Sequence, residues 1–322
     1  MKRNKVPLFT LFFLALLSAS NIDANMLTRT KVIMGTFVSI SLEAEDKKHF
    51  KPAFALLKSV DNSLSSFKED SPIYKLNKNK NASLDYYSYE ALTLSKHYYQ
   101  TTDAYFNIAI GSITKDLYKF GQKEQLPTKK LLHTSNTSLE ALHFNKKKAT
   151  LSQAIKIDLG GMGKGYGVDT VAAYFKTQHI QKAIIAASGD IRCLHQCKIE
   201  INNPFSKKYL ASFQTKSKDM GISTSGNYEH YVQSTFHNHL INPKTKSSQK
   251  NFISITLISK LKSATLDAYA TAVSVMPKAE AFAFLKKQAL AFIILDTNKK
   301  LTVSQNINRY VDKLLINDCF NK

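Results

Sequence analysis

A glycine-rich turn near the middle of the chain constrains the fold more than any other feature. It runs Asp158-Leu159-Gly160-Gly161-Met162-Gly163-Lys164-Gly165-Tyr166-Gly167, with five glycines in eight residues. We expect a strand over 154–159 before it and a helix from about Gly165 after it. Glycine lets the backbone approach a ligand closely and adopt positive φ. The amides at the helix start, together with the Lys164 ammonium, predict a site for an anion such as pyrophosphate.

Two familiar nucleotide-binding motifs do not describe this turn. The Gly163-Lys164 pair is followed by glycine, whereas a Walker loop requires Ser or Thr at that position. The glycine spacing also differs from the dinucleotide fingerprint of a Rossmann fold. A tight turn that binds no ligand is the simpler alternative.

A second segment, at the start of a predicted helix near Leu266, carries Asp267 and Thr271. Residues four apart lie on one helical face, so a carboxylate and a hydroxyl would be neighbours there. Both are hard oxygen ligands of the type that Mg²⁺ prefers. The alternative is that Asp267 only interacts favourably with the helix dipole.

The first residues have the layout of a secretory signal peptide. A basic start precedes an apolar run from Leu8 to Leu17, and small residues follow as far as Ala24. The run is shorter than the ~20 residues that span a bilayer. We therefore expect a leader over 1–24, a single domain over 25–322 and an exported, periplasmic protein, with peripheral attachment to the inner membrane as a further option. A short uncleaved anchor is the alternative.

Charge and cysteine content narrow the partners only slightly. The net charge of +21 favours anionic partners in general, but the lysines are scattered, as on a solvated surface. With an export signal, nucleic acid is a poor candidate partner. Cys193 and Cys197 are close enough in sequence to pair in an oxidising compartment, and two free thiols fit the spacing equally well.

Hydrophobic periodicity predicts a mixture of strands and helices. Alternation of Val38, Ile40 and Leu42 indicates a half-buried strand over 32–42, with Met34 inside it. Strands are also expected over 183–187, 198–201 and 291–295, and loops with short strands over 117–150. Helices are expected over 51–65 and 87–102, from about 266, and up to about 288. Because the two types do not alternate strictly, the pattern favours an α+β fold over a doubly wound sheet.

Several short motifs, ordinary one by one, occur in a fixed order over about residues 28 to 300. They are Met34-Gly35-Thr36, Ser65-Ser66-Phe67, Asp103-Ala104-Tyr105-Phe106-Asn107, the glycine-rich turn, Ser188-Gly189-Asp190, Thr224-Ser225-Gly226, His239-Leu240-Ile241-Asn242-Pro243-Lys244-Thr245 and Asp267-Ala268-Tyr269-Ala270-Thr271. In this order the chain resembles the FAD:protein FMN transferases, the ApbE family. So many motifs in one order are hard to produce by chance.

The resemblance implies a fold of antiparallel-rich sheets with packed helices, and a reaction. FMN would be transferred from FAD to a Thr or Ser hydroxyl of another protein in a Mg²⁺-dependent step that releases AMP. The acceptors would be exported flavoproteins, including subunits of membrane-bound NADH and ferredoxin oxidoreductases.

The family's site residues map onto this sequence one by one. Magnesium would be held by the side chains of Asp267 and Thr271 and by the backbone carbonyl of Gly161. We assign catalysis to Lys164 and to His239, whose neutral imidazole suits proton abstraction near neutral pH. FAD would contact Met34, Phe67, Ala104, Tyr105, Phe106, Asp158, Lys164 and Ile241.

The chain departs from the family pattern at four positions. Asn107 replaces an Asp, while Ala104, Ser188 and Lys246 replace glycines. A left-handed backbone is less favourable for a lysine than for glycine. The proposed metal side chains and Lys164 are unaltered, so the sequence predicts an active enzyme with changed substrate handling.

Two other functions are compatible with the same residues. One is an FAD pyrophosphatase, in which water replaces the acceptor hydroxyl and FMN and AMP are released. The other is a non-catalytic periplasmic flavin-binding protein, although binding alone needs no metal ligands.

Overall fold

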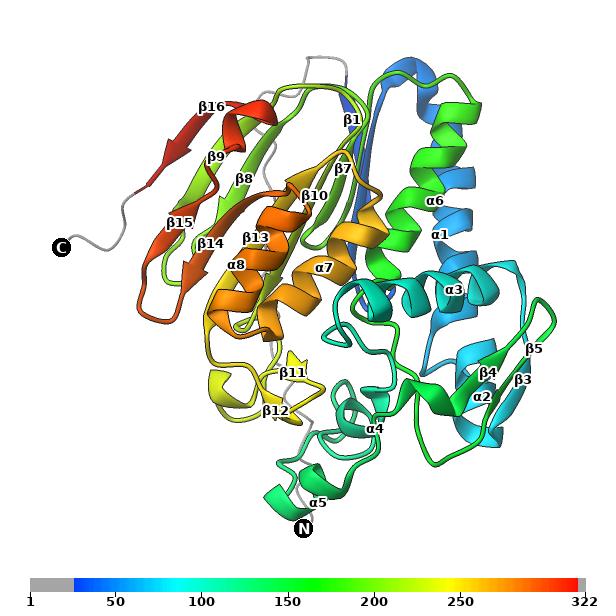
Figure 1. Ribbon diagram of the computed structural model, residues 1–322. Helices are drawn as coiled ribbons and strands as arrows, with labels where there is room; N and C mark the ends of the chain where they lie inside the picture. The colour runs from blue at the N-terminus through cyan, green and yellow to red at the C-terminus, as the bar shows by residue number, and fades with distance from the viewer. Residues whose placement is uncertain (1–25, 318–322) are drawn as a thin grey trace, which may run out of the picture.

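The structure is a computed structural model that describes residues 26–317 (Figure 1). The predicted signal peptide, residues 1–24, lies outside the described residues.

The first part of the chain supplies a hairpin, several helices and a small sheet. Its elements are β1 (Met26–Ile33), β2 (Thr36–Glu43), η1 (Ala44–His49), α1 (Phe50–Leu64), α2 (Pro72–Asn79), β3 (Asn81–Ser83), α3 (Tyr86–Thr101), α4 (Gly111–Thr114), α5 (Lys129–Thr134), η2 (Leu139–Ala141), β4 (Leu142–Phe144) and β5 (Lys148–Leu151).

The second part supplies most of the strands. Its elements are α6 (Gly163–Thr177), β6 (Ala183–Ala187), β7 (Asp190–Cys193), β8 (Lys198–Asn202), β9 (Tyr209–Thr215), β10 (Met220–Gly226), η3 (Thr235–His237), β11 (Ile241–Asn242), β12 (Ser247–Ser248), β13 (Phe252–Ser259), α7 (Ser263–Val275), α8 (Lys278–Lys287), β14 (Ala291–Asp296), β15 (Leu301–Val303), η4 (Ile307–Arg309) and β16 (Val311–Ile316).

An eight-stranded sheet in the order β1-β2-β6-β7-β10-β13-β14-β15 forms the centre of the molecule. Wherever the structure describes neighbouring strands of this sheet, they run antiparallel. The predicted α+β fold with antiparallel-rich sheets is therefore confirmed. A hairpin can close an antiparallel pair with few residues, which explains why strands that follow each other in the chain lie side by side.

Helices cover one face of this sheet and a second sheet covers the other. α1 and α6 pack on β2 and β6 around Leu57, Phe175 and Ile185, and α7 lies across β10 and β13 (Figure 1). On the opposite face, the sheet β16-β9-β8 packs against β7, β10, β13 and β14 through a separate apolar cluster that includes Phe213 and Ile222. The layered arrangement leaves the ends of α6 and α7 adjacent.

Local sequence explains the helices that were predicted. α1 buries Ala53, Leu57, Val60 and Leu64 on one face and has Pro52 in its first turn, where a missing N–H is harmless. α3 begins at a capping box in which Asp85 accepts from the Ser88 amide and Ser88 accepts from the Asp85 amide. The predicted helices over 51–65 and 87–102 are confirmed to within one residue at each end.

Two of the strand predictions, over residues 32–42 and 154–159, are wrong in whole or in part. Met34 does not lie inside a strand: Met34 and Gly35, with φ of 56° and 70°, form the two-residue turn between β1 and β2. Residues 154–159 form no strand, since their one ladder contact is an isolated bridge from Lys156 to Ile110. Alternating apolar residues there fill a core beside the loop instead of pairing in a sheet.

Two further features bear on the compartment. Cys193 and Cys197 form a disulfide across the turn that follows β7. Over residues 26–317, none of the helices has both the length and the apolar character required to cross a bilayer.

Candidate functional site

The glycine-rich turn ends where α6 begins, and α6 crosses the first turn of α7 at very short range. A Cβ on Gly165 would lie 2.3 Å from the carbonyl oxygen of Ser263, so only glycine permits this approach. The Asp169 carboxylate then accepts from the amides of Ser263 and Ala264, at 2.8 and 2.9 Å. One helix therefore caps the other, which fixes the turn relative to α7.

This contact brings the three predicted metal ligands together. The Thr271 hydroxyl lies 3.3 Å from the Gly161 carbonyl oxygen, and a Cβ on Gly161 would come within 3.1 Å of that hydroxyl. Asp267 lies one turn earlier on α7, is buried, and accepts from the Gly165 amide at 3.1 Å. A carboxylate, a hydroxyl and a carbonyl thus converge from two segments, and all three are hard oxygen donors suited to Mg²⁺.

Lys164 projects into the same place. Its ammonium nitrogen lies 3.2 Å from the Asp190 carboxylate and 3.4 Å from that of Asp267. Burial alone would lower the pKa of Lys164, but the two carboxylates raise it above its ordinary value, so the side chain stays charged.

The carboxylates share this one cation. Burial, followed by the neighbouring Asp190 charge, raises the pKa of Asp267 well above its usual range, and Lys164 only partly opposes the rise. In a simple ion pair the pKa of the acid would fall while that of the base rises, yet the pKa values of Lys164 and Asp267 are both raised. The reason is that two buried acids face a single base, which leaves the group of three with excess negative charge for a further cation.

Asp158, at the start of the turn, is held as a carboxylate. It accepts from Thr114 at 2.6 Å and from the Gly160 amide at 3.0 Å, and the Lys115 ammonium lies 3.4 Å away. Although burial alone would raise its pKa, Lys115 and these hydrogen bonds hold the pKa of Asp158 below its ordinary value. The Lys115 ammonium also lies 4.3 Å from the ring centre of the half-exposed Phe67. Lys115 therefore contacts both Asp158 and Phe67, two of the residues predicted to bind FAD.

His239 is oriented by a backbone carbonyl. Its Nδ1 donates to the carbonyl oxygen of His230 at 3.0 Å. Burial lowers the pKa of His239 to about 4. The hydrogen bond to the His230 carbonyl opposes this, the His230 and Lys164 charges add to the lowering, and the Asp158 charge opposes it. The ring is therefore neutral at physiological pH.

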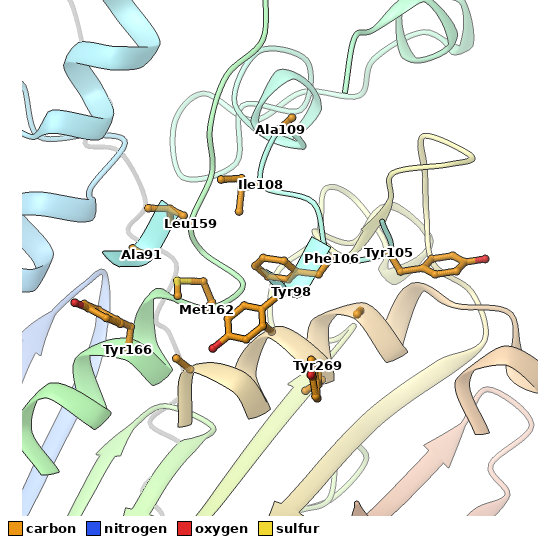
Figure 2. Close-up of a cluster of buried hydrophobic side chains, with 14 of the residues drawn as sticks. Ala91, Tyr98, Tyr105, Phe106, Ile108, Ala109, Leu159, Met162, Tyr166 and Tyr269 are labelled. Carbon is orange, nitrogen blue, oxygen red and sulfur yellow. The ribbon is translucent and has the colours of Figure 1, made fainter. Parts of the chain in front are cut away.

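The aromatic segment after α3 divides in two. Phe106 is buried edge-on to Tyr98, and a Cβ on Gly161 would lie 3.3 Å from its ring. Tyr105 points away from this group (Figure 2) and donates to Glu280 at 2.8 Å, under the Lys244 ammonium. Of these two neighbours, only Phe106 contacts the glycine turn.

Ala104 instead borders a separate cavity of about 320 Å³. Asn107 and Lys246 also line this cavity, so three of the four departures from the family pattern meet there. Asn107 donates to the Thr137 carbonyl, and Lys246 donates to those of His133 and Ser135. The cavity wall over 135–138 is therefore held in part by Asn107 and Lys246, two of the positions that depart from the family pattern.

The remaining two predicted residues lie at the edges of the site. Met34 contacts α6, where a Cβ on Gly167 would meet its Cε at 2.9 Å. The Ile241 side chain is buried in an apolar cluster with Tyr118 and Phe120, and its predicted contact with FAD stays a prediction.

Sequence reasoning left three charged residues out of the site. Asp190 belongs to a noted motif but received no role, and Lys115 lies just before the stretch over 117–150, in a segment for which the sequence predicted neither an element nor a role. Glu229 is accessible to solvent, yet surrounding protein raises the pKa of its carboxyl, against the effect of Lys164. Their positions depend on contacts between distant segments, for which the sequence holds no local signal.

Over residues 26–317 there is no cluster of three or more His, Cys, Asp or Glu side chains arranged to hold a metal ion. The oxygen set described above contains only one such side chain, Asp267, and its other members are a hydroxyl and a backbone carbonyl.

The fold is an α+β fold in which an antiparallel sheet is covered by helices on one face and by a second sheet on the other. Its candidate site, where the glycine-rich turn meets the helix that carries Asp267 and Thr271, has groups suited to an anion and groups suited to a cation. A family model described as the ApbE family matches residues 34–294. The chain belongs to the ApbE family.

Relatives of known name and known structure agree with this membership. The FAD:protein FMN transferase of Haemophilus influenzae is 27% identical over 317 residues, which cover 88% of this chain and 90% of that protein. The protein of the same name from Buchnera aphidicola is 25% identical and covers 96% of both.

Among solved structures, the ApbE protein of Thermotoga maritima superposes with a TM-score of 0.80 at 20% identity, covering 89% of this chain and 100% of that one. The flavin transferase ApbE of Vibrio cholerae superposes with a TM-score of 0.76, also at 20% identity, covering 88% and 99%. At 20% identity, these superpositions are evidence for the fold alone.

Proposed function

We propose that this protein is a Mg²⁺-dependent transferase that cleaves FAD and transfers FMN to a Thr or Ser hydroxyl of another protein, releasing AMP. The relatives from Haemophilus influenzae and Buchnera aphidicola are named FAD:protein FMN transferases, which supports the transfer of FMN from FAD to a protein. The observation that carries the proposal is the meeting of the Gly161 carbonyl, the Thr271 hydroxyl and the Asp267 carboxylate beside the Lys164 ammonium.

The residues present fit a magnesium ion. They offer three hard oxygens of different kinds, and the absence of a Cβ at Gly161 is what lets its carbonyl reach Thr271. When bound there, the ion would draw negative charge from a diphosphate and so stabilise the charge that develops during cleavage.

The chain's own groups provide the remaining chemistry. Lys164 binds a phosphate oxygen of FAD, and the turn amides at the start of α6 contact the diphosphate. The Nε2 atom of His239 accepts the proton of the acceptor hydroxyl, whose oxygen then bonds to the phosphorus on the riboflavin side. The bond from that phosphorus to the bridging oxygen breaks, and AMP leaves with the bonding electrons.

The cavity lined by Ala104 and Asn107, which contains no residue of the glycine-rich turn, is the candidate place for one end of the dinucleotide. Its volume of about 320 Å³ suits one end of FAD, not the whole molecule. The three departures that border it, Ala104, Asn107 and Lys246, support altered handling of that end.

We further propose that the protein works in the periplasm, with exported flavoproteins as acceptors. These include subunits of membrane-bound NADH and ferredoxin oxidoreductases, and peripheral association with the inner membrane would bring the enzyme to them. The leader-like start of the sequence and the disulfide between Cys193 and Cys197 support this compartment, since disulfides persist in oxidising surroundings.

The test is an intact-mass measurement on an acceptor flavoprotein domain incubated with this protein, FAD and Mg²⁺. We expect the acceptor's mass to rise by one FMN. Free FMN with an unlabelled acceptor would instead identify an FAD pyrophosphatase. FAD retained without cleavage would identify a flavin-binding protein.

The metal set is tested by Asp267→Ala. Loss of this carboxylate removes an oxygen ligand and an interaction worth several kcal/mol, so FAD cleavage should fall by at least about 100-fold. Asp70→Ala is the matched control, because the Asp70 side chain is fully exposed. Full activity in Asp267→Ala would remove the proposed mechanism.

A further inference from the structure

The carbonyl oxygen of His230 accepts two hydrogen bonds from one residue. The His239 backbone amide donates to it at 3.0 Å, and so does His239 Nδ1, also at 3.0 Å. A carbonyl can only accept, so Nδ1 must carry the hydrogen. In a neutral ring this leaves Nε2 with a free lone pair, which is the form that a general base requires.

The position of residue 230 therefore sets both the tautomer and the orientation of His239. His230 itself is held by its side chain, because its Nε2 lies 2.5 Å from Glu124 Oε1. The ring also packs edge-on against Phe120, with centroids 5.0 Å apart.

Glu124 connects this histidine to a different part of the chain. The same carboxylate oxygen accepts from the Gly121 amide at 3.1 Å, and Glu124 is 106 residues from His230 in sequence. Phe120, just before Gly121, stacks on Tyr118 with centroids 5.0 Å apart. The turn that contains Gly121 and Glu124, held by its own hydrogen bond, thus fixes the position of His230, on which the orientation of His239 depends.

We propose that Glu124 and His230 are positioning residues for His239, linked as carboxylate, imidazole, backbone carbonyl and base. The inference rests on the proposed function, in which His239 takes the acceptor proton. Neither Glu124 nor the His230 side chain contacts the reacting atoms. Their effect is to keep Nε2 of His239 unprotonated and aimed in one direction.

The charges around His239 support this arrangement. The groups that act on its ring are His230, Lys164 and Asp158. The charges of His230 and Lys164 lower the pKa of His239, whereas the hydrogen bond to the His230 carbonyl and the Asp158 charge raise it. If His230 moved away on release from Glu124, the loss of that hydrogen bond would remove the larger of the two raising effects.

The experiment compares Glu124→Gln with Glu69→Gln, a control at an exposed glutamate on the loop before α2. Side-chain ¹⁵N NMR should show His239 as a single Nδ1-protonated tautomer in the wild type and the control. In Glu124→Gln a mixture of tautomers should appear. Single-turnover FAD cleavage should fall about tenfold, as expected for a misplaced catalytic group, with the dissociation constant of FAD unchanged.

Further variants separate positioning from general loss of structure. Glu124→Asp keeps the carboxylate and should recover part of the rate and the single tautomer. His230→Gln tests the link from the other side if Glu124→Gln does not fold. A single unchanged tautomer with an unchanged rate, or a rate that falls only together with FAD affinity, would overturn the proposal.

The NMR result also distinguishes this proposal from the proposed function. If the wild type neither cleaves FAD nor labels an acceptor, the function fails. The tautomer comparison would still show whether Glu124 and His230 set the state of His239.

Discussion

Three residues near the site hold a left-handed backbone although each carries a side chain. Ala104, Ser188 and Lys246 have φ of 63°, 55° and 57°, and these are the positions where the family pattern has glycine. The left-handed backbone considered for Lys246 is therefore observed. Its two hydrogen bonds to the carbonyls of His133 and Ser135 offset the strain, whereas the methyl group of Ala104 can form none.

Ser188→Gly should stabilise the protein. The left-handed conformation costs a non-glycine residue ~1–2 kcal/mol, which the change to glycine would relieve. The greater conformational freedom of glycine in the unfolded chain offsets part of this stabilisation. We expect the free energy of unfolding, measured in urea, to increase by about 0.5–1 kcal/mol. Ser83→Gly in β3, where φ is not positive, should destabilise instead, and equal effects of the two changes would contradict the strain argument.

Magnesium binding should weaken as the pH falls. Burial and Asp190 raise the pKa of Asp267, so below this pKa a proton must leave before the carboxylate can bind a cation. The affinity should be constant at higher pH and fall up to about tenfold per pH unit below the raised pKa. Calorimetric titrations at about pH 8 and about pH 6 would check this, and equal affinities would show that Asp267 is not a ligand.

At the level of elements, the contact between α6 and α7 determines whether the site exists. α7 carries Asp267 and Thr271, and its first turn is held against α6 by Asp169 and by the missing side chain of Gly165. Any displacement between the helices would separate the Gly161 carbonyl from Thr271.

Gly165→Ala should disrupt this contact. Its Cβ would collide with the Ser263 carbonyl, which is backbone and cannot turn aside. We expect a loss of about 1–3 kcal/mol in the free energy of unfolding, together with weaker Mg²⁺ binding. Gly163→Ala is the control two residues earlier, because a Cβ there meets nothing within 4 Å. Similar losses in both variants would mean that the helix contact is not the cause.

The elements that could be predicted from the sequence are those whose signal is local. The apolar faces of α1 and α3 and the apolar run of β6 were found nearly to the residue, because periodicity alone specifies them. The turn at Met34 was missed because a methionine with positive φ has no signature in composition. Residues 154–159 were misread because an apolar loop over a core alternates much as a strand does.

The site shows the same division. Asp267 and Thr271 could be paired from their spacing on one helix. The contacts of Asp190 with Lys164, and of Glu124 with His230, join segments 26 and 106 residues apart, and only the fold creates them.

On the scale of the whole molecule, the disulfide after β7 ties down the middle of the large sheet. Cys193 and Cys197 are buried against strands of both sheets. A bridge across so short a loop restricts the unfolded chain and contributes about 2 kcal/mol. Replacing both cysteines by serine should lower the free energy of unfolding by this amount, as measured in urea under non-reducing conditions. An unchanged midpoint would show that the bridge adds nothing.

The oxygen set joins Gly161 and Thr271, which are 110 residues apart. A nascent polypeptide that has not yet closed this long loop contains every individual ligand and still lacks a place for the ion. The oxygen set can therefore form only once α7 has packed against α6 and the completed sheet.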